Sequence, residues 1–260
     1  MKKIGINEIE DLKIGHAHSR KGVTGCSVFL FEKGAVAGVD IRGGAPGSRE
    51  TALLKPDKLI NKIHAIMLAG GSAFGLDAAS GAVTYLEENE IGFETGAARV
   101  PIVSSSILYD LEIGSSKIRP NLDMGYQACL NASEDEFPNG NIGVGMGATI
   151  GKIAGPEQMM KGGLGTAAYK IGELKVGAVV AVNSLGDIID PESGKIIAGA
   201  LEENKNSFLD TEKIFYENYR KNNNIFGTNT SLGVVITNAK LNKVEANKIA
   251  SKAHNGYALT

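Results

Sequence analysis

Apolar runs with short polar breaks divide the chain into segments that predict strands and helices. Residues 63–68 are almost entirely apolar and lead into Ala69-Gly70-Gly71, a pattern typical of a buried strand followed by a tight turn. We expect a helix to follow, with Ser72 as its N-cap and Gly92 just beyond its end. Its apolar positions recur near the helical period, at Phe74, Ala78, Ala82 and Leu86.

The rest of the chain carries similar signals. Residues 23–42 predict a β-hairpin, whose strands flank a turn at Glu32-Lys33-Gly34. Further strands are expected at 100–108, 165–171, 176–182 and 230–237, helices at 124–132, 210–219 and 243–256, and a polar loop at 221–224. Because strands and helices occur in groups, the pattern favours sheets packed in layers with helices outside over a doubly wound parallel sheet.

Composition narrows the class of protein. The chain has 260 residues, enough for one large domain or two small ones. A net charge of −2 argues against a nucleic-acid-binding protein, whose signature is a basic excess. No apolar run is long enough to cross a bilayer, and the charged start lacks the apolar core of a signal peptide. We therefore expect a cytoplasmic protein in which Cys26 and Cys129 are small buried hydrophobes.

Two glycine-rich segments and a histidine pair suggest binding sites only weakly. Ala69–Gly75 joins a strand to a helix but lacks the lysine ending and the glycine spacing of phosphate-binding loops, which favours a tight turn. Residues 140–151 fail the same patterns, so their glycines are expected to allow close backbone approach. His16 and His18 alternate on a predicted strand, but without a third ligand they favour packing or surface roles over a metal site.

Thr230 suggests a more specific chemistry. A threonine hydroxyl is a weak nucleophile unless a base activates it, and the α-amine of an N-terminal threonine is such a base, with a pKa of about 7.7–8.0. A cut between Asn229 and Thr230, where a polar loop enters a strand, would create that terminus. On the residue pattern, Asn-Thr at such a junction is also common. Tyr109 at a strand end, Lys152 after a glycine-rich strand and Asn183 at a turn have ordinary structural roles when each is taken separately.

Eight segments, in the order in which they occur, resemble one enzyme family. They are 24–28, 40–47, 68–78, 100–103 with 109–111, 145–152, 161–165, 190–191 with 197–200, and 229–235. The last, Asn229-Thr230-Ser231-Leu232-Gly233-Val234-Val235, is similar to the family's cleavage segment. Over essentially its whole length the chain resembles the DmpA-type aminopeptidases, peptidase family S58, which include β-peptidyl aminopeptidases and nylon-oligomer hydrolases.

The resemblance implies a fold and an assembly. It implies that residues 1–260 form a single α/β domain, a four-layer α/β/β/α sandwich similar to the N-terminal-nucleophile hydrolases but with different connectivity. It also implies self-cleavage between Asn229 and Thr230, and a homo-oligomer, usually a tetramer of the resulting αβ pairs. Family members continue into a further strand with a polar pair that orients the nucleophile, and this sequence ends at Thr260, before the corresponding residues.

The resemblance also implies roles for four residues. Thr230 corresponds to the nucleophile and its amine base, and Asn183 to a side-chain amide that stabilises the oxyanion of the transition state. Tyr109 matches a tyrosine that hydrogen-bonds in the site. Lys152 matches a lysine of the nylon-hydrolase branch, whose charge would stabilise the oxyanion or depress the pKa of the amine.

The expected activity is hydrolysis of small peptides, amides or esters through an acyl-Thr230 intermediate, with no metal or organic cofactor. Two alternatives stay open at this point. One is an unprocessed or inactive relative that serves as a binding or assembly subunit, which the early end of the sequence would favour. The other is an acyltransferase, because ornithine acetyltransferases share this fold and a threonine nucleophile.

Overall fold

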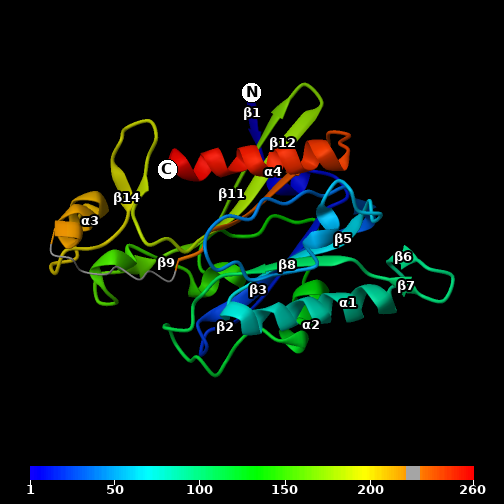
Figure 1. Ribbon diagram of the computed structural model, residues 1–260, viewed down its shortest axis with the longest axis horizontal. Coiled ribbons are helices and arrows are strands. Elements are labelled where there is room, and N and C mark those ends of the chain that lie inside the picture. Colours follow the sequence, from blue (N-terminus) through cyan, green and yellow to red (C-terminus); the bar gives the residue numbers. More distant parts are fainter. Residues whose placement is uncertain (221–228) are drawn as a thin grey trace.

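Two β-sheets form the centre of the computed structural model, which describes residues 1–220 and 229–260 (Figure 1). The four-stranded sheet is antiparallel throughout, in the order β1 (Lys2–Ile4), β11 (Gly163–Ile171), β12 (Leu174–Val182) and β15 (Leu232–Thr237). The five-stranded sheet has the order β2 (Lys13–Ser19), β3 (Thr24–Ala35), β5 (Ile63–Ala69), β8 (Val103–Ile107) and β4 (Ser48–Arg49). In this second sheet β5 and β8 run parallel, and the other neighbours are antiparallel.

The two sheets share one apolar core. In the four-stranded sheet alternate residues face this core, because successive side chains of a strand point to opposite faces. Its buried members include Leu164, Ala168, Val179, Ala181, Val234 and Ile236. The five-stranded sheet contributes Ile14, Phe29 and Leu68 to the same core. Strand β3 is buried on both faces from Cys26 to Leu30 because its other face is also covered.

Helices α1 (Ala78–Glu88) and α2 (Leu122–Leu130) cover the outer face of the five-stranded sheet (Figure 1). The two helices approach closely where glycines meet backbone. A Cβ on Gly81 would lie 2.1 Å from the carbonyl oxygen of Leu122, and one on Gly125 would lie 1.9 Å from that of Ala78. Only glycine therefore permits this crossing, which builds the second core between these helices and the sheet.

Helix α4 (Lys243–Ala258) forms the layer outside the four-stranded sheet and crosses β11 and β12 (Figure 1). Gly233 of β15 lies between inward-facing residues, so its missing side chain would point outward, and a Cβ there would lie 2.5 Å from the hydroxyl oxygen of Tyr257 on α4. The order of layers is thus helices, sheet, sheet, helix, which confirms the predicted α/β/β/α sandwich.

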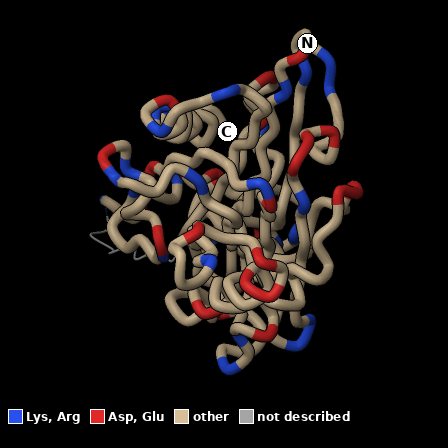
Figure 2. The backbone as a smooth tube through the Cα atoms, turned by 90° about the vertical axis from the view of Figure 1, so that its right-hand side faces the viewer, with Lys and Arg blue, Asp and Glu red and all other residues tan. Residues whose placement is uncertain are grey.

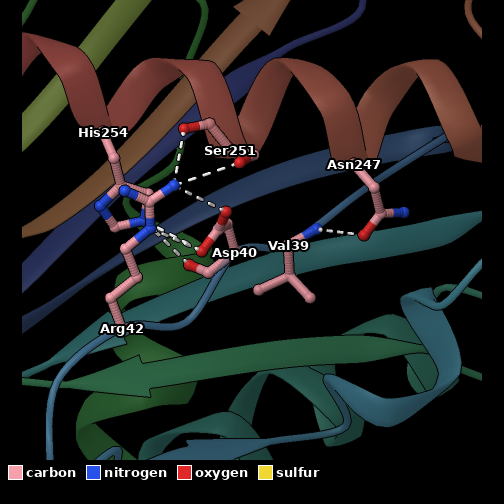
Figure 3. Close-up of polar contacts among 6 residues, drawn as sticks. All are labelled: Val39, Asp40, Arg42, Asn247, Ser251 and His254. Atoms are coloured by element: carbon pink, nitrogen blue, oxygen red, sulfur yellow. Dashed lines mark hydrogen bonds and ion pairs between the residues drawn. The ribbon is translucent and has the colours of Figure 1, made fainter.

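Helix α4 is fixed by polar contacts to residues 38–60. Its start is a capping box, in which Glu245 N–H donates to Asn242 Oδ1 and Asn242 N–H donates to Glu245 Oε2. Figure 3 shows the middle and end of the helix against residues 39–42. There Val39 N–H donates to Asn247 Oδ1 at 3.2 Å, and the guanidinium of Arg42 bridges Asp40 and Ser251.

The remaining elements are short. They include β6 (Phe93–Glu94) paired with β7 (Arg99–Val100), β9 (Thr149–Ile150) with β10 (Met160–Lys161), and β13 (Ile188–Ile189) with β14 (Ile196–Ala198). Helix α3 (Thr211–Arg220) and β14 lie at one end of the molecule, beyond the C-terminal end of α4 (Figure 1). Over the described residues, acidic and basic positions are interspersed rather than gathered on one side (Figure 2).

The predicted hairpin at 23–42 is wrong. Strand β3 runs through the expected turn to Ala35 and pairs with β2, so the hairpin turn lies at residues 20–23 instead. Gly34 has φ +74°, but it lies in an irregular stretch of the β3–β5 ladder and does not reverse the chain. Glu32 forms an ion pair with Lys13 of β2, so polar residues that were interpreted as a turn belong to strand β3.

The N-cap assigned to Ser72 is also wrong. Ser72 has φ +54° and begins a 3-10 helix, Ser72–Asp77, before α1 starts at Ala78. Its N–H donates to the carbonyl of Leu108, a contact with the neighbouring strand end that no local pattern reveals. Strands β5, β11, β12 and β15 and helices α2, α3 and α4 agree with the predictions to within about two residues of each end. The loop predicted at 221–224 lies outside the described residues.

Candidate active site

Sheet register places Thr230 beside Asn183. Strands β12 and β15 are antiparallel, and their pairing ends with Ala181 opposite Leu232. Two residues further on, the N–H of Thr230 donates to the carbonyl of Asn183 at 2.9 Å. Directly opposite residues of an antiparallel pair direct their side chains to the same face. Two residues that lie 47 positions apart in the sequence therefore meet just beyond the ends of their strands.

The side chain of Asn183 is the hub of this site. It is fully buried, at 0% exposure, and three segments hold it. Its Oδ1 accepts from Lys152 Nζ at 2.6 Å and from the N–H of Thr149 at 3.0 Å, and its Nδ2 donates to the carbonyl of Tyr109 at 2.9 Å. Since one end of the amide faces donors and the other faces an acceptor, only one orientation of the side chain satisfies all three contacts.

Lys152 reaches Asn183 from the start of a 3-10 helix, Lys152–Ala154. The preceding residue, Gly151, has φ +73°, and a Cβ there would lie 2.1 Å from the backbone nitrogen of Ala200. Glycine is required for this close approach, which turns Lys152 inward. Burial lowers the pKa of Lys152 to about 8, while the negative charges of Glu112 and Asp110 act in the opposite direction. Lys152 is therefore half-buried with its ammonium bonded to Asn183, which its local sequence pattern does not indicate.

The hydroxyl of Thr230 lies against the peptide group that precedes it. Its Oγ1 is 2.7 Å from the carbonyl oxygen of Asn229. Asn229 is exposed and Thr230 is half-buried, so the Asn229–Thr230 bond sits at the edge of the buried site. Tyr109 joins the site through its main-chain carbonyl, and its half-buried side chain follows the end of β8. Lys152, Tyr109 and Thr230 are therefore each hydrogen-bonded to Asn183, and Asn229 adjoins Thr230 in the chain.

Two neighbours of these residues did not figure among the sequence candidates. Thr149 holds the amide oxygen of Asn183 through its N–H, and nothing in its local sequence indicates that contact. Asp110 is 3% exposed, and its carboxylate accepts from Thr24 Oγ1 and from the N–H of Gly71, both at 2.7 Å. The available signal was a single acidic residue inside the otherwise apolar stretch 107–111. A buried charge in such a stretch requires partners.

The weaker sequence candidates have packing roles. The turn at 69–75 is closed by contacts within the protein, because Gly70 N–H donates to Gly25 and Gly71 N–H to Asp110. His16 packs edge-on against Phe137 and contacts Ser27 Oγ at 2.8 Å, and burial lowers the pKa of His16 to about 4. Cys26 and Cys129 are buried free thiols, as expected, and burial raises the pKa of both.

Among residues 1–220 and 229–260, no group of three or more His, Cys, Asp or Glu side chains is placed to hold a metal ion. None of the helices in the same ranges combines the length and apolar character needed to span a membrane.

Sequence comparisons connect this chain to hydrolases of amide bonds. The model of peptidase family S58 matches residues 5–260. An uncharacterized aminopeptidase of Mycobacterium leprae (strain TN) is 36% identical over 272 aligned positions, which cover 98% of this chain and 73% of the relative. The 6-aminohexanoate-oligomer endohydrolase of Kocuria sp. (strain KY2) is 32% identical over 247 positions, covering 94% of this chain and 66% of that enzyme. These matches favour neither the non-catalytic subunit nor the acyltransferase.

Structure comparisons show the same fold in solved proteins. The L-aminopeptidase D-Ala-esterase/amidase of Ochrobactrum anthropi, described as a new variant among the Ntn hydrolase fold, superposes with a TM-score of 0.69 at 14% identity. The match covers 98% of this chain and 69% of that one. A Burkholderia sp. beta-aminopeptidase gives a TM-score of 0.66 at 18% identity, with 98% and 67% covered. At these identities the comparison shows the fold.

Proposed function

Because this chain belongs to peptidase family S58, we propose that it hydrolyses amide bonds with Thr230 as its nucleophile. Membership makes it a peptide or amide hydrolase, and the nucleophile, the self-cleavage and the substrates are proposed here. The observation that carries the proposal is the position of Thr230. Its Oγ1 lies 2.7 Å from the carbonyl oxygen of Asn229, and its N–H is bonded to Asn183, so the hydroxyl and both sides of the Asn229–Thr230 bond meet at one site.

The first proposed reaction is self-cleavage. Oγ1 of Thr230 attacks the carbonyl carbon of Asn229, and the bond from that carbon to the nitrogen of Thr230 breaks. The nitrogen takes the proton of the hydroxyl, which leaves an ester between Asn229 and Thr230. Water then hydrolyses this ester and releases Asn229 as a carboxylate, with the hydroxyl and the α-amine of Thr230 both free.

The freed α-amine then serves as the base for turnover. Its usual pKa of about 7.7–8.0 allows it to accept the proton of Oγ1 near neutral pH. Oγ1 attacks the carbonyl carbon of the substrate, and the amine product of the substrate leaves with the proton that the α-amine of Thr230 had accepted. Water then hydrolyses the acyl-Thr230 ester. An amide nitrogen has two N–H donors, and Asn183 uses one of them on Tyr109. We assign the second to the oxyanion, with Lys152 and Thr149 holding the amide in that orientation.

The substrate class follows from the relatives named above. One is named an aminopeptidase and another a 6-aminohexanoate-oligomer endohydrolase. We propose release of N-terminal residues from short peptides, or hydrolysis of small amides and esters. None of the proposed steps requires a metal or an organic cofactor.

The cytoplasmic location and the homo-oligomer stay predictions. Association is supported by apolar side chains that remain exposed on the outer face of the four-stranded sheet, among them Tyr169, Val176 and Val235. Light scattering of the purified protein would measure the oligomeric state.

Replacement of Thr230 tests the proposal. Thr230→Ala removes the hydroxyl, so we expect neither cleavage before residue 230 nor hydrolysis of aminoacyl p-nitroanilides. Thr230→Ser keeps a hydroxyl and should retain both activities in part. Ser231→Ala, which removes the exposed hydroxyl of the next residue, is the matched control and should behave as the unaltered protein. Cleavage at the same bond in Thr230→Ala would contradict the mechanism.

A further inference from the structure

Asp110 has a buried carboxylate beside the candidate site that the proposed mechanism does not use. Both of its oxygens are engaged: Oδ2 accepts from Thr24 Oγ1 and Oδ1 accepts from the N–H of Gly71, each at 2.7 Å. Thr24 begins β3, and Gly71 follows β5. The carboxylate therefore ties the end of β8 to two other strands of the five-stranded sheet.

Backbone closes around this carboxylate on two further sides. A Cβ on Gly70 would lie 2.1 Å from Asp110 Oδ2, and a Cβ on Gly147 would lie 2.2 Å from the same atom. These positions therefore accept glycine and no larger residue while Asp110 is in place. Lys161 holds the backbone on either side of Gly147, because its Nζ donates to the carbonyls of Met146 and Ala148 at 2.6 and 3.0 Å.

The charge balance also suits a fixed carboxylate. Burial raises the pKa of Asp110, whereas the bonds from Thr24 and Gly71 and the positive charge of Lys161 lower it. The groups that face the carboxylate thus include a hydroxyl, a backbone N–H and a nearby ammonium, which together satisfy a charge that would be costly if it were unpaired.

The position of Asp110 in the chain connects this cluster to Asn183. The carbonyl that accepts from Asn183 Nδ2 belongs to Tyr109, and it lies in the same peptide group as the backbone nitrogen of Asp110. A peptide group is planar, so holding the residue on one side of it restrains the direction of the carbonyl. The direction of that carbonyl determines which N–H of Asn183 donates within the protein and which one is left to donate to the substrate.

We propose that Asp110 is a positioning residue, which fixes the Tyr109–Asp110 peptide group and thereby aims the second N–H of Asn183 at the oxyanion. This inference rests on the proposed function for its catalytic consequence. Its structural part, that Asp110 and Thr24 determine the state of the Asn183 amide, stands independently of activity.

The first test uses Thr24, which can be changed without removing the buried charge. Thr24→Val keeps the shape of the side chain and loses the bond to Asp110, whereas Thr24→Ser keeps the hydroxyl. In ¹H–¹⁵N spectra, the side-chain amide of Asn183 is identified by its loss in Asn183→Ala. We expect this signal to shift in Thr24→Val and to stay in place in Thr24→Ser. An unchanged signal in Thr24→Val would overturn the inference, even in a protein without measurable hydrolysis.

The second test is kinetic. Asp110→Ala should lower kcat about 10–100-fold with little change in KM, because small misplacement of a catalytic group can cost about 10² in rate. Asp110→Asn, in which the amide keeps an acceptor for Gly71 and the Thr24 hydroxyl can reverse, should restore most of the rate. Rates are normalised to the cleaved fraction. Equal loss in Asp110→Asn and Asp110→Ala would overturn a positioning role in favour of direct catalysis by the carboxylate.

A double variant separates positioning from general damage. If Asp110 acts through Asn183, then Asp110→Ala should cost less than about 3-fold in a protein that already carries Asn183→Ala, since effects of residues that act as a unit do not add. A full additional 10–100-fold loss would contradict the proposal. Because the amide signal is read separately, a shifted signal in an inactive protein would count against the proposed function and not against the positioning.

Discussion

Lys243 and Lys152 both donate to main-chain carbonyls, Lys243 from a buried position and Lys152 from a half-buried one, and their partners differ. Lys243, at the start of α4, donates to the carbonyls of Leu53, Lys58 and Ile60 at 2.8–2.9 Å and is 7% exposed. Lys152 donates to the carbonyl and to the side-chain oxygen of Asn183. An ammonium has three N–H donors, so the acceptors of Lys243 use all of its capacity within one segment of the fold.

The partners of each lysine indicate its role. The acceptors of Lys243 belong to residues 53–60, which it attaches to α4, so its removal affects the fold. The acceptor of Lys152 is itself bonded to Tyr109 and to Thr230, so its removal affects the geometry of the candidate site. Burial of a lysine therefore does not by itself identify a functional residue. The two lysines are distinguished by the other contacts that their acceptor residues make.

After the complete loss expected for Thr230→Ala, the largest effect within the site is that of Asn183→Ala. Loss of an oxyanion donor costs about 10²–10³ in turnover, and we expect that reduction in kcat for p-nitroanilide hydrolysis. Because Lys152 is assigned to the site through its bond to Asn183, the variant also tests that assignment. An unchanged kcat would remove Asn183 from the catalytic site, and Lys152 would then have a structural role like that of Lys243.

Lys243→Met should destabilise the fold without harming the chemistry. It leaves three carbonyls without their donor, and we expect the free energy of unfolding to fall by about 2–4 kcal/mol. Urea unfolding measures this change, and Lys248→Met, an exposed lysine on the same helix, is the control. If the rate per folded molecule also fell tenfold, the assignment of Lys243 to structure would be wrong.

Lys152→Met should show the opposite pattern. Without the ammonium, Oδ1 of Asn183 keeps only Thr149, and we expect kcat to fall about 10–100-fold while stability changes little. Lys195→Met, at an exposed position, provides the comparison. A large loss of stability with normal kcat would assign Lys152 to the same structural class as Lys243.

The smallest effect is a pH dependence. With a pKa of about 8, Lys152 loses its proton as the pH rises through 8, so kcat should decline there, and Lys152→Arg should shift this decline to higher pH.

The contribution of Lys152 to the free energy of unfolding should instead increase as the pH rises. The pKa is depressed in the folded state, so the unfolded chain binds more protons between about pH 8 and 10.5, and the contribution of Lys152 to stability rises across that window. A parallel loss of fold and activity above pH 8 would contradict this assignment.

The sequence could predict the elements that depend on local pattern, and it could not predict the positions that depend on contacts with distant segments. Local patterns gave β5, β11, β12, β15 and the main helices, because each depends on its own periodicity. They failed at 32–34 and at Ser72, where contacts with β2 and with Leu108 decide the conformation.

The candidate site shows the same division. Thr230, Asn183, Tyr109 and Lys152 were found through a family resemblance, and the register of β12 and β15 explains why the first two meet. The contacts of Thr149 and Asp110 could not be predicted, because each depends on where another segment passes in the folded chain.

The central claim is that Thr230 becomes a free N-terminal nucleophile, and an intact-mass spectrum of the purified, denatured protein tests it most directly. The account predicts two species whose masses together correspond to the 27.2 kDa chain plus one water, the smaller one beginning at Thr230. A single species of 27.2 kDa in a preparation that hydrolyses p-nitroanilides would contradict it, because the nitrogen of Thr230 would still be part of a peptide bond.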